Sequence, residues 1–308
     1  MSRDFLSMDD VTPSELGYLL ELAASGKADP GRYATRLAGR AVGMIFEKPS
    51  TRTRVSFEVA VSSTGGHPLA LSSAELQLGR GETIEDTGRV LSRYLDAIVL
   101  RTFGHERLEF LASAAEVPVI NALSDFEHPC QCLADLMTVR ERRGDLPGLT
   151  IAYLGDGNNV AHSLLLGGAL AGMHVRVATP IGFEPIPQVV RRAEEIAGHT
   201  GGSIAILNDP AEAAKGADVL YTDVWASMGQ EDESDERALV FPPYRIDQAA
   251  VERAADDVVV LHCLPAHRGQ EITDEVIDGP HSAVWDQAEN RLHTQRALLL
   301  WLLGVDAD

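Results

Sequence analysis

Residues 40–54 read Arg-Ala-Val-Gly-Met-Ile-Phe-Glu-Lys-Pro-Ser-Thr-Arg-Thr-Arg, a short apolar run placed directly before the start of a helix. The run over 40–46 predicts a buried strand, and a helix is expected over 51–64 because Ser50 and Thr51 are good capping residues. A strand that passes into a helix is the unit from which parallel sheets covered by helices are built. This stretch therefore indicates an α/β fold.

The same stretch carries a signal for an anion. Arg52 and Arg54 lie in the first turn of the predicted helix, where the helix dipole already places positive charge. Backbone N–H groups, hydroxyls and guanidinium groups together suit a phosphate, and Lys48-Pro49 favours an extended approach to the site. An N-capped helix with two solvated arginines stays the alternative for this stretch taken alone.

The alternation of strands and helices continues to the end of the chain. We expect an α/β protein with two domains, each a mainly parallel sheet flanked by helices and linked by long helices, with a boundary near 136–144. The first helix is expected over 13–25, with Gly26 ending it. Further strands are predicted at 67–71, 97–100, 117–121, 150–154, 175–178, 204–207, 219–221 and 258–261. One further helix follows the polar loop 72–81 and ends near 94, and a long helix begins near 129. The remaining helices are predicted at 106–115, 158–171, 186–197 and 287–303.

Composition limits the classes of partner. The chain has 308 residues, 45% of them hydrophobic and 23% charged, which is typical of a folded protein of two ordinary domains. A net charge of −20 and a pI near 4.8 argue against nucleic acid or an anionic membrane as a partner. We expect no membrane span or secretion signal, and the three cysteines fit a reducing cytosol. The acidity itself is most simply a solubility feature.

His-Pro-Cys-Gln at 128–131 is a second candidate site, at the start of the long helix. Ligands in such folds bind at the carboxyl edge of the sheet, where His128 and Gln131 could polarise a carbonyl. A histidine that caps its own helix is the alternative. We expect no metal, because Cys130 and Cys132 are two residues apart on a helix and point to different faces.

Gly-Asp-Gly-Asn-Asn at 155–159 follows a predicted strand and opens a helix, as a dinucleotide-binding loop does. The third glycine of that fingerprint is missing, since Val160 stands in its place. The two asparagines favour a small polar group, such as a carboxylate or an amide, over a nucleotide.

The stretch 223–229, Asp-Val-Trp-Ala-Ser-Met-Gly, follows another predicted strand. Asp223 could hold an ammonium group, while Ser227 and the backbone of Met228 could hold a carboxylate. The alternative for Trp225 and Met228 is packing.

His-Cys-Leu-Pro at 262–265 also ends a predicted strand, and Cys263 could be a thiol with a perturbed pKa or a small buried hydrophobe. Arg101 ends the strand at 97–100 and Arg291 lies in the last helix. Each of these arginines, taken alone, would be interpreted as a surface residue.

In this order, and over essentially the whole chain, the motifs resemble those of the ornithine carbamoyltransferases, within the aspartate/ornithine carbamoyltransferase superfamily. The Ser-Thr-Arg-Thr-Arg at 50–54 and the His-Pro-Cys-Gln at 128–131 are typical of carbamoyltransferases generally. The stretches 223–229 and 262–265 point to the ornithine branch. Cys132 stands where a small residue is expected, and we expect no catalytic effect from it.

The resemblance implies two substrate sites on two domains. It assigns carbamoyl phosphate to residues 1–136, completed by the C-terminal helix 287–308, and ornithine to residues 137–286. It places Cys263 and Leu264 between the two substrates, and it implies catalytic roles for Thr53, Arg101, His128 and Cys263. The implied carbamoyl phosphate ligands are Ser50, Thr51, Arg52, Thr53, Gln77, Arg101, His128, Gln131 and Arg291, and the implied ornithine ligands are Asn159, Asp223, Ser227 and Met228.

The implied reaction transfers a carbamoyl group to the side-chain amine of ornithine, giving citrulline and phosphate in arginine metabolism, with no cofactor. The resemblance also implies a homotrimer and closure of the two domains around the substrates. The alternatives are a carbamoyltransferase acting on another amine such as putrescine, a nucleotide-binding oxidoreductase or regulator, and a non-catalytic relative.

Overall fold

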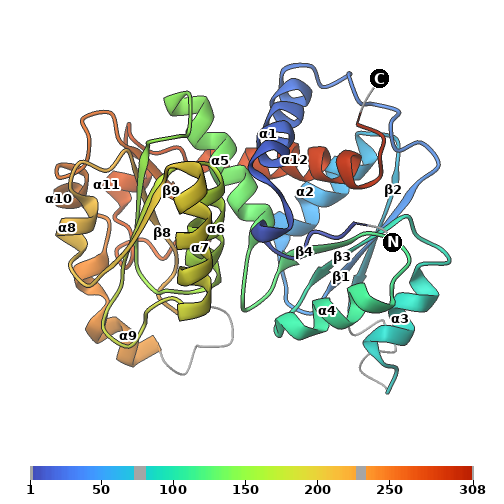
Figure 1. Cartoon of the computed structure of the whole chain (residues 1–308), viewed down its shortest axis with the longest axis horizontal. Coiled ribbons are helices and arrows are strands. Elements are labelled where there is room, and N and C mark those ends of the chain that lie inside the picture. The colour runs from blue at the N-terminus through green and yellow to red at the C-terminus, as the bar shows by residue number, and fades with distance from the viewer. Residues whose placement is uncertain (1–2, 73–80, 227–233, 307–308) are drawn as a thin grey trace. The chain divides into compact units, whose positions relative to one another are not determined.

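The computed structural model describes residues 3–72, 81–226 and 234–306, and the chain divides into two compact units. Unit 1 comprises Met1–Ala134 together with Glu289–Asp308, and unit 2 comprises Asp135–Ala288. Two long helices pass from one unit into the other along the chain: α5 (Pro129–Arg143) and α12 (Val284–Leu302) (Figure 1). Each unit holds a parallel sheet with helices around it, so the expected α/β fold is confirmed.

The sheet of unit 1 has four parallel strands in the order β2-β1-β3-β4. Apolar residues on both faces are buried, as expected for a parallel sheet with helices on each side, and β3 is buried along its whole length. The strands are β1 (Ala41–Phe46), β2 (His67–Ser72), β3 (Ala97–Arg101) and β4 (Val119–Leu123).

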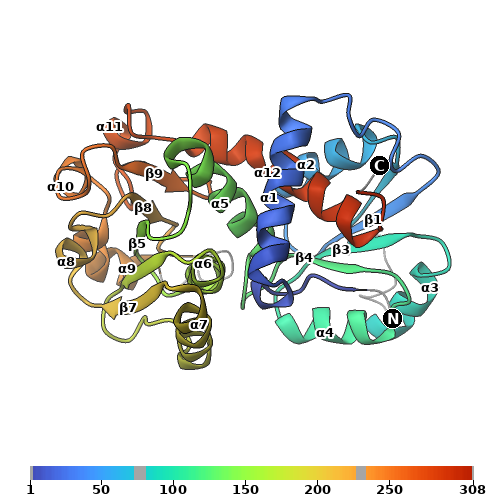
Figure 2. The ribbon, with the colours of Figure 1, turned by 45° about the horizontal axis from the view of Figure 1, so that its top comes forward.

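Helices cover both faces of this sheet. Figure 2 shows α3 and α4 on one face and α2 and α12 on the other. Ile84 of α3 and Leu108 and Leu111 of α4 share a core cluster with Ile45 and Leu100 of the strands. The remaining elements of unit 1 are η1 (Met8–Asp10), α1 (Pro13–Ala28), α2 (Thr51–Ser62), α3 (Ile84–Leu91) and α4 (His105–Ala114).

Helix α1 begins as expected and ends later. Thr12 and Glu15 form a capping box around Pro13, which fits the first helical position. The prediction that Gly26 ends the helix was wrong, because α1 continues to Ala28. A Cβ at Gly26 would lie 2.5 Å from Nη2 of Arg296, so this glycine allows close packing instead of terminating the helix.

The sheet of unit 2 has five parallel strands in the order β7-β6-β5-β8-β9. Every residue of helix α6 is buried. Four helices of four to seven residues were not predicted from the sequence, because they are too short for an apolar period to show. The elements are β5 (Thr150–Leu154), α6 (Asn159–Leu170), β6 (His174–Ala178), α7 (Pro187–Thr200), β7 (Ser203–Leu207), α8 (Pro210–Ala214), β8 (Val219–Thr222), α9 (Ser234–Val240), η4 (Pro242–Tyr244), α10 (Gln248–Val251), β9 (Val259–His262) and α11 (Asp274–Ile277).

The strand orders locate a switch point in each sheet. In unit 1 the order reverses between β1 and β3, and in unit 2 it reverses between β5 and β8. The loops that leave neighbouring strands at such a point diverge, and ligands bind there, at the carboxyl ends of the strands. Within the described residues, no helix is long and apolar enough to cross a membrane.

Candidate active site

The switch point of unit 1 presents the start of α2. Ser50 is the N-cap, and its hydroxyl accepts a hydrogen bond from the Thr53 N–H at 3.2 Å. Arg54 bonds to Glu58 one turn along the helix at 2.9 Å; the Arg54 side chain is exposed and that of Glu58 is half-buried. The expectation that an anion compensates both arginines is therefore corrected: Arg54 is balanced by Glu58, and Arg52 is the arginine left for a ligand.

A buried arginine ties three segments of unit 1 together. Arg291 of α12 donates from Nη1 to Oε1 of Gln131 at 2.6 Å and from Nη2 to Oγ1 of Thr53 at 3.2 Å. All three side chains are buried. The structure thus brings together, from α2, α5 and α12, three residues that the sequence singled out separately.

His128 lies among these cations. It is buried, and burial lowers the pKa of its imidazole well below the ordinary value, with the charges of Arg291, Arg101 and Arg52 acting in the same direction. The ring is therefore neutral near pH 7, so it can donate a hydrogen bond from a ring N–H without carrying charge. Arg101 is buried at the end of β3. The register between β3 and β4 shifts between Leu100 and Arg101, an irregularity of the kind that changes the direction of a strand.

This arrangement suits an anion that is joined to a polarised carbonyl. Three guanidinium groups and the N-terminus of α2 supply positive charge, and Thr53 and His128 supply neutral donors. Cys130 takes no part, because burial raises the pKa of its thiol to about 12 and the thiol donates to the carbonyl of Asn121 at 3.3 Å.

The switch point of unit 2 holds a carboxylate and a thiol. Asp223 follows β8 and is buried. Its Oδ1 accepts a hydrogen bond from the Cys263 thiol at 2.9 Å, and its Oδ2 accepts from the side-chain amide of Asn158 at 3.0 Å. Both asparagines were candidates from the sequence, but only Asn159 was among the implied ornithine ligands; Asn158 occupies the N-cap of α6, a position that favours asparagine.

Behind Cys263 lies a buried pair that the sequence did not reveal. His262 Nε2 lies 3.1 Å from Glu271 Oε1, and His262 Nδ1 accepts a hydrogen bond from the Leu264 N–H at 2.8 Å. Leu264 has a φ of 59°, a conformation that a leucine rarely adopts without support. Atoms of Asp223, His262 and Cys263 lie within 4.8 Å of one another, but both ring nitrogens of His262 are engaged in these contacts.

Arg237 is a further residue that sequence reasoning missed. It is buried, and its Nη1 donates to Oδ2 of Asp156 at 2.8 Å and to the carbonyl of Trp225 at 2.7 Å. Its guanidinium lies 4.9 Å from the centre of the Phe183 ring, and Trp225 stacks on Phe241. Arg237 therefore fastens the loop after β5 to the segment after β8.

The glycine loop after β5 is shaped by packing. Gly157 donates its N–H to the carbonyl of Phe183 at 2.9 Å, and a Cβ there would lie 2.3 Å from the backbone nitrogen of Pro185. The close approach of two backbones accounts for this glycine without a nucleotide. The predicted ligands Gln77, Ser227 and Met228 lie outside the described residues.

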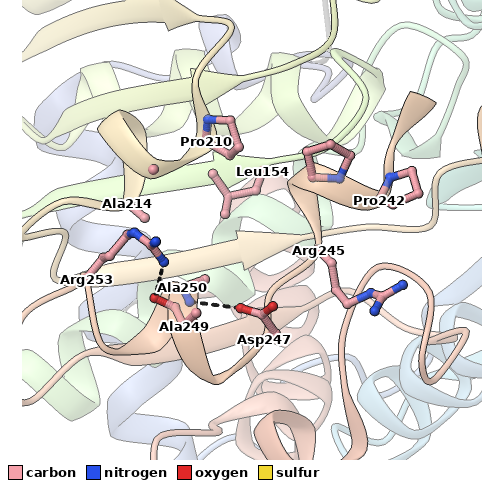
Figure 3. A pocket seen from close by; sticks show the side chains of 11 residues that line it. Leu154, Pro210, Ala214, Pro242, Arg245, Asp247, Ala249, Ala250 and Arg253 are labelled. Carbon is pink, nitrogen blue, oxygen red and sulfur yellow. Dashed lines mark hydrogen bonds between the residues drawn. The ribbon is translucent and has the colours of Figure 1, made fainter. Parts of the chain in front are cut away.

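A pocket of about 270 Å³ lies elsewhere in unit 2, between α8, η4 and α10 (Figure 3). Leu154, Arg245 and Arg253 are among its lining residues, and none of the predicted site residues lines it. Arg253 donates to the carbonyl of Ala249 at 2.6 Å and Arg245 to that of Gln270 at 2.6 Å. Its arginines thus serve the local backbone.

Fold and sites together define a two-unit α/β protein with a cationic site at one switch point and an acid–thiol site at the other. Two family models match it: the carbamoyl-P binding domain of aspartate/ornithine carbamoyltransferase over residues 3–141, and the Asp/Orn binding domain of the same family over residues 147–302. The chain belongs to the aspartate/ornithine carbamoyltransferase family.

Individual relatives agree with this assignment. The chain is 63% identical to an ornithine carbamoyltransferase from a Parafrankia species, covering 98% of this chain and 96% of the relative. It is 61% identical to one from Acidothermus cellulolyticus, covering 99% and 98%. The solved ornithine carbamoyltransferase from Pyrococcus furiosus is similar with a TM-score of 0.95 at 54% identity, covering 98% of this chain and 97% of that one.

Proposed function

We propose that this protein transfers the carbamoyl group of carbamoyl phosphate to the side-chain amine of L-ornithine, giving L-citrulline and phosphate. The observation that carries the proposal is the buried set in which Arg291 binds Gln131 and Thr53 beside a neutral His128. Relatives that are 55–63% identical over nearly the whole chain have the name ornithine carbamoyltransferase, which supports the choice of substrates.

Carbamoyl phosphate is assigned to unit 1. Arg52 and Arg291 would neutralise the phosphate, both while it is bound and as it leaves, and the N-terminus of α2 would add backbone donors. The assigned ligands remain Ser50, Thr51, Arg52, Thr53, Gln77, Arg101, His128, Gln131 and Arg291.

The attacked carbonyl develops negative charge on its oxygen as the amine adds. Thr53, Arg101 and His128 are the donors assigned to that oxygen. A neutral imidazole suits this role, because it donates a hydrogen bond without repelling the neighbouring arginines. Removal of one such donor typically lowers the rate by about 10²–10³-fold.

Ornithine is assigned to unit 2. Asp223 would hold its α-ammonium group, because both carboxylate oxygens are already oriented by Cys263 and Asn158. Asn159, Ser227 and Met228 are assigned to the rest of the amino-acid group, with Cys263 and Leu264 next to the reacting atoms.

The attacking amine must be neutral, although its free pKa is near that of lysine, about 10.4. Nearby guanidinium groups lower an amine pKa by repulsion between like charges. Either the leaving phosphate or Cys263 in its thiolate form would accept the proton, so the proposed chemistry assigns no step to a metal or an organic cofactor.

The decisive experiment measures product formation from carbamoyl phosphate with L-ornithine, putrescine or L-aspartate as the acceptor. We expect citrulline with ornithine and little product with the other two, since neither presents both an amino-acid group and a side-chain amine. Preferential formation of carbamoylputrescine would overturn the choice of acceptor. Arg52→Gly should raise KM for carbamoyl phosphate far more than KM for ornithine, and equal losses would contradict the assignment of Arg52.

A homotrimer working in the cytosol belongs to the same proposal. Val55 and Val59 lie one turn apart on α2 and are 52% and 41% exposed, so the helix next to the anion site offers an apolar strip to another copy. The three cysteines, all within the described residues, form no disulfide, as in proteins of reducing compartments. Light scattering of the purified protein would test the trimer, and a monomeric mass would contradict it.

A further inference from the structure

Strands β1 and β3 stay joined beyond the end of their sheet. The last paired residues are Phe46 and Arg101, and the next N–H, that of Glu47, donates to the carbonyl of Arg101 at 2.9 Å. The Thr102 hydroxyl then donates to Oε2 of Glu47 at 2.5 Å. One residue further, Lys48 Nζ lies 4.1 Å from the centre of the Phe103 ring. The two chains therefore keep contact at the switch point, where they would otherwise diverge.

Arg107 of α4 fastens this connection from a third element. Its Nε donates to Oε2 of Glu47 at 3.0 Å and its Nη2 donates to Oε1 at 2.5 Å, a bidentate pair. The Glu47 side chain is 11% exposed and that of Arg107 is 37% exposed, so the pair is well shielded on the carboxylate side. Bidentate pairs of this kind restrict orientation as well as adding energy.

We propose that Glu47 and Arg107 are positioning residues for the carbamoyl phosphate site. The inference rests on the proposed function of unit 1. Glu47 stands three residues before the Ser50 cap and is bonded to the backbone of Arg101, so it holds together the two loops that carry these ligands.

Charge gives Arg107 a second effect. A carboxylate close to an anion site weakens that site, all the more in a chain of net charge −20. The guanidinium of Arg107 compensates the charge of Glu47, so Glu47 can orient the loops without repelling the phosphate. Loss of Arg107 would leave this carboxylate shielded and without its counter-ion.

The first test replaces Arg107 and measures both substrates in citrulline formation. Arg107→Gln should raise KM for carbamoyl phosphate, and Ki for inorganic phosphate as a competitive inhibitor, by about tenfold. KM for ornithine at saturating carbamoyl phosphate should change less than about twofold. Arg93→Gln is the matched control, because Arg93 forms an ion pair with Glu116 in which both side chains are exposed. It should leave all three constants unchanged.

A second variant separates positioning from loss of the fold. In Glu47→Gln/Arg107→Gln no carboxylate is left without a counter-ion, so this double variant should bind carbamoyl phosphate more tightly than Arg107→Gln alone. Thr102→Val keeps the shape and removes one donor to Glu47, and it should raise the same KM by a smaller factor, about threefold.

Several outcomes would overturn the inference: equal changes in both KM values, no change for Arg107→Gln, or a double variant no better than the single one. A wild-type protein that forms no citrulline would instead defeat the proposed function. Thermal unfolding of each variant verifies that the protein assayed is folded.

Discussion

The two sites of this protein occupy equivalent places in their sheets and have opposite chemistry. In unit 1, the segments after β1 and at the end of β3 present arginines and the loop after β4 presents a neutral histidine, with Arg291 already bonded to Gln131 and Thr53. In unit 2, the loops after β5, β8 and β9 present a carboxylate that a thiol and an amide hold on both oxygens. In the proposed function, one topology offers a place for an anion in one unit and for an amine in the other, and the side chains alone decide which.

The strongest test of this difference between the two sites removes positive charge from unit 1. Arg101→Met should lower kcat by about 10²–10³-fold, because the carbonyl oxygen loses a charged donor in the transition state. Initial rates of citrulline formation at saturating substrates measure it. A variant in which KM for carbamoyl phosphate rises while kcat is retained would show that Arg101 binds the ground state only.

The matching change in unit 2 removes negative charge. Asp223→Asn keeps the shape and should lower kcat/KM for ornithine by about 10²-fold, since a shielded carboxylate that pairs with an ammonium group is lost. KM for carbamoyl phosphate should stay nearly constant. A comparable loss for both substrates would mean that the two units do not divide recognition by charge.

A smaller effect is expected from the thiol that contacts Asp223. Cys263→Ser should lower kcat by about tenfold and shift the pH profile of turnover, because a serine hydroxyl, unlike a thiol, does not ionise to a proton-accepting anion in the working pH range. Turnover measured across the pH range tests this role. An unchanged profile would rule out proton transfer through this side chain.

The smallest effect concerns stability near His128. The folded-state pKa of His128 lies below its unfolded value of about 6.5, so the unfolded chain binds the proton first as pH falls. The free energy of unfolding should therefore decrease below about pH 6.5, by at most about 1.4 kcal/mol per pH unit for this residue. His128→Asn should flatten that slope in denaturant titrations at pH 7.5 and 5.5, whereas His199→Asn, which alters an exposed ring, should not. Equal slopes in all three proteins would contradict the contribution of His128.

The parts of the fold that the sequence predicted are those with local signals. The Ser50 cap, the capping box at Thr12 and the long buried strands follow from neighbouring residues, and so do the sites at strand ends. Motifs such as 128–131 predicted that particular residues lie at the carboxyl edge of a sheet. The parallel topology brings these residues together, because the carboxyl ends of its strands meet at one edge.

What escaped prediction depends on partners distant in sequence. The resemblance placed Arg291 and Gln131 in one site, but no local pattern predicts the direct hydrogen bond between these residues, which are 160 positions apart. Glu271 and Arg237 matter only through buried contacts with His262 and Trp225. Gly26 resembled a helix stop because its role depends on Arg296, which packs against it from the far end of the chain.

The composition of unit 1 has a consequence for biosynthesis. Its sheet is complete by β4, yet Arg291 lies in α12, which follows all of the strands of unit 2 in the chain. A ribosome will have synthesised all of unit 2 before the proposed phosphate site has its last arginine, so the nascent chain cannot assemble that site until unit 2 has been made. A protein that lacks α12 would therefore lose the proposed anion site while keeping every strand of both sheets.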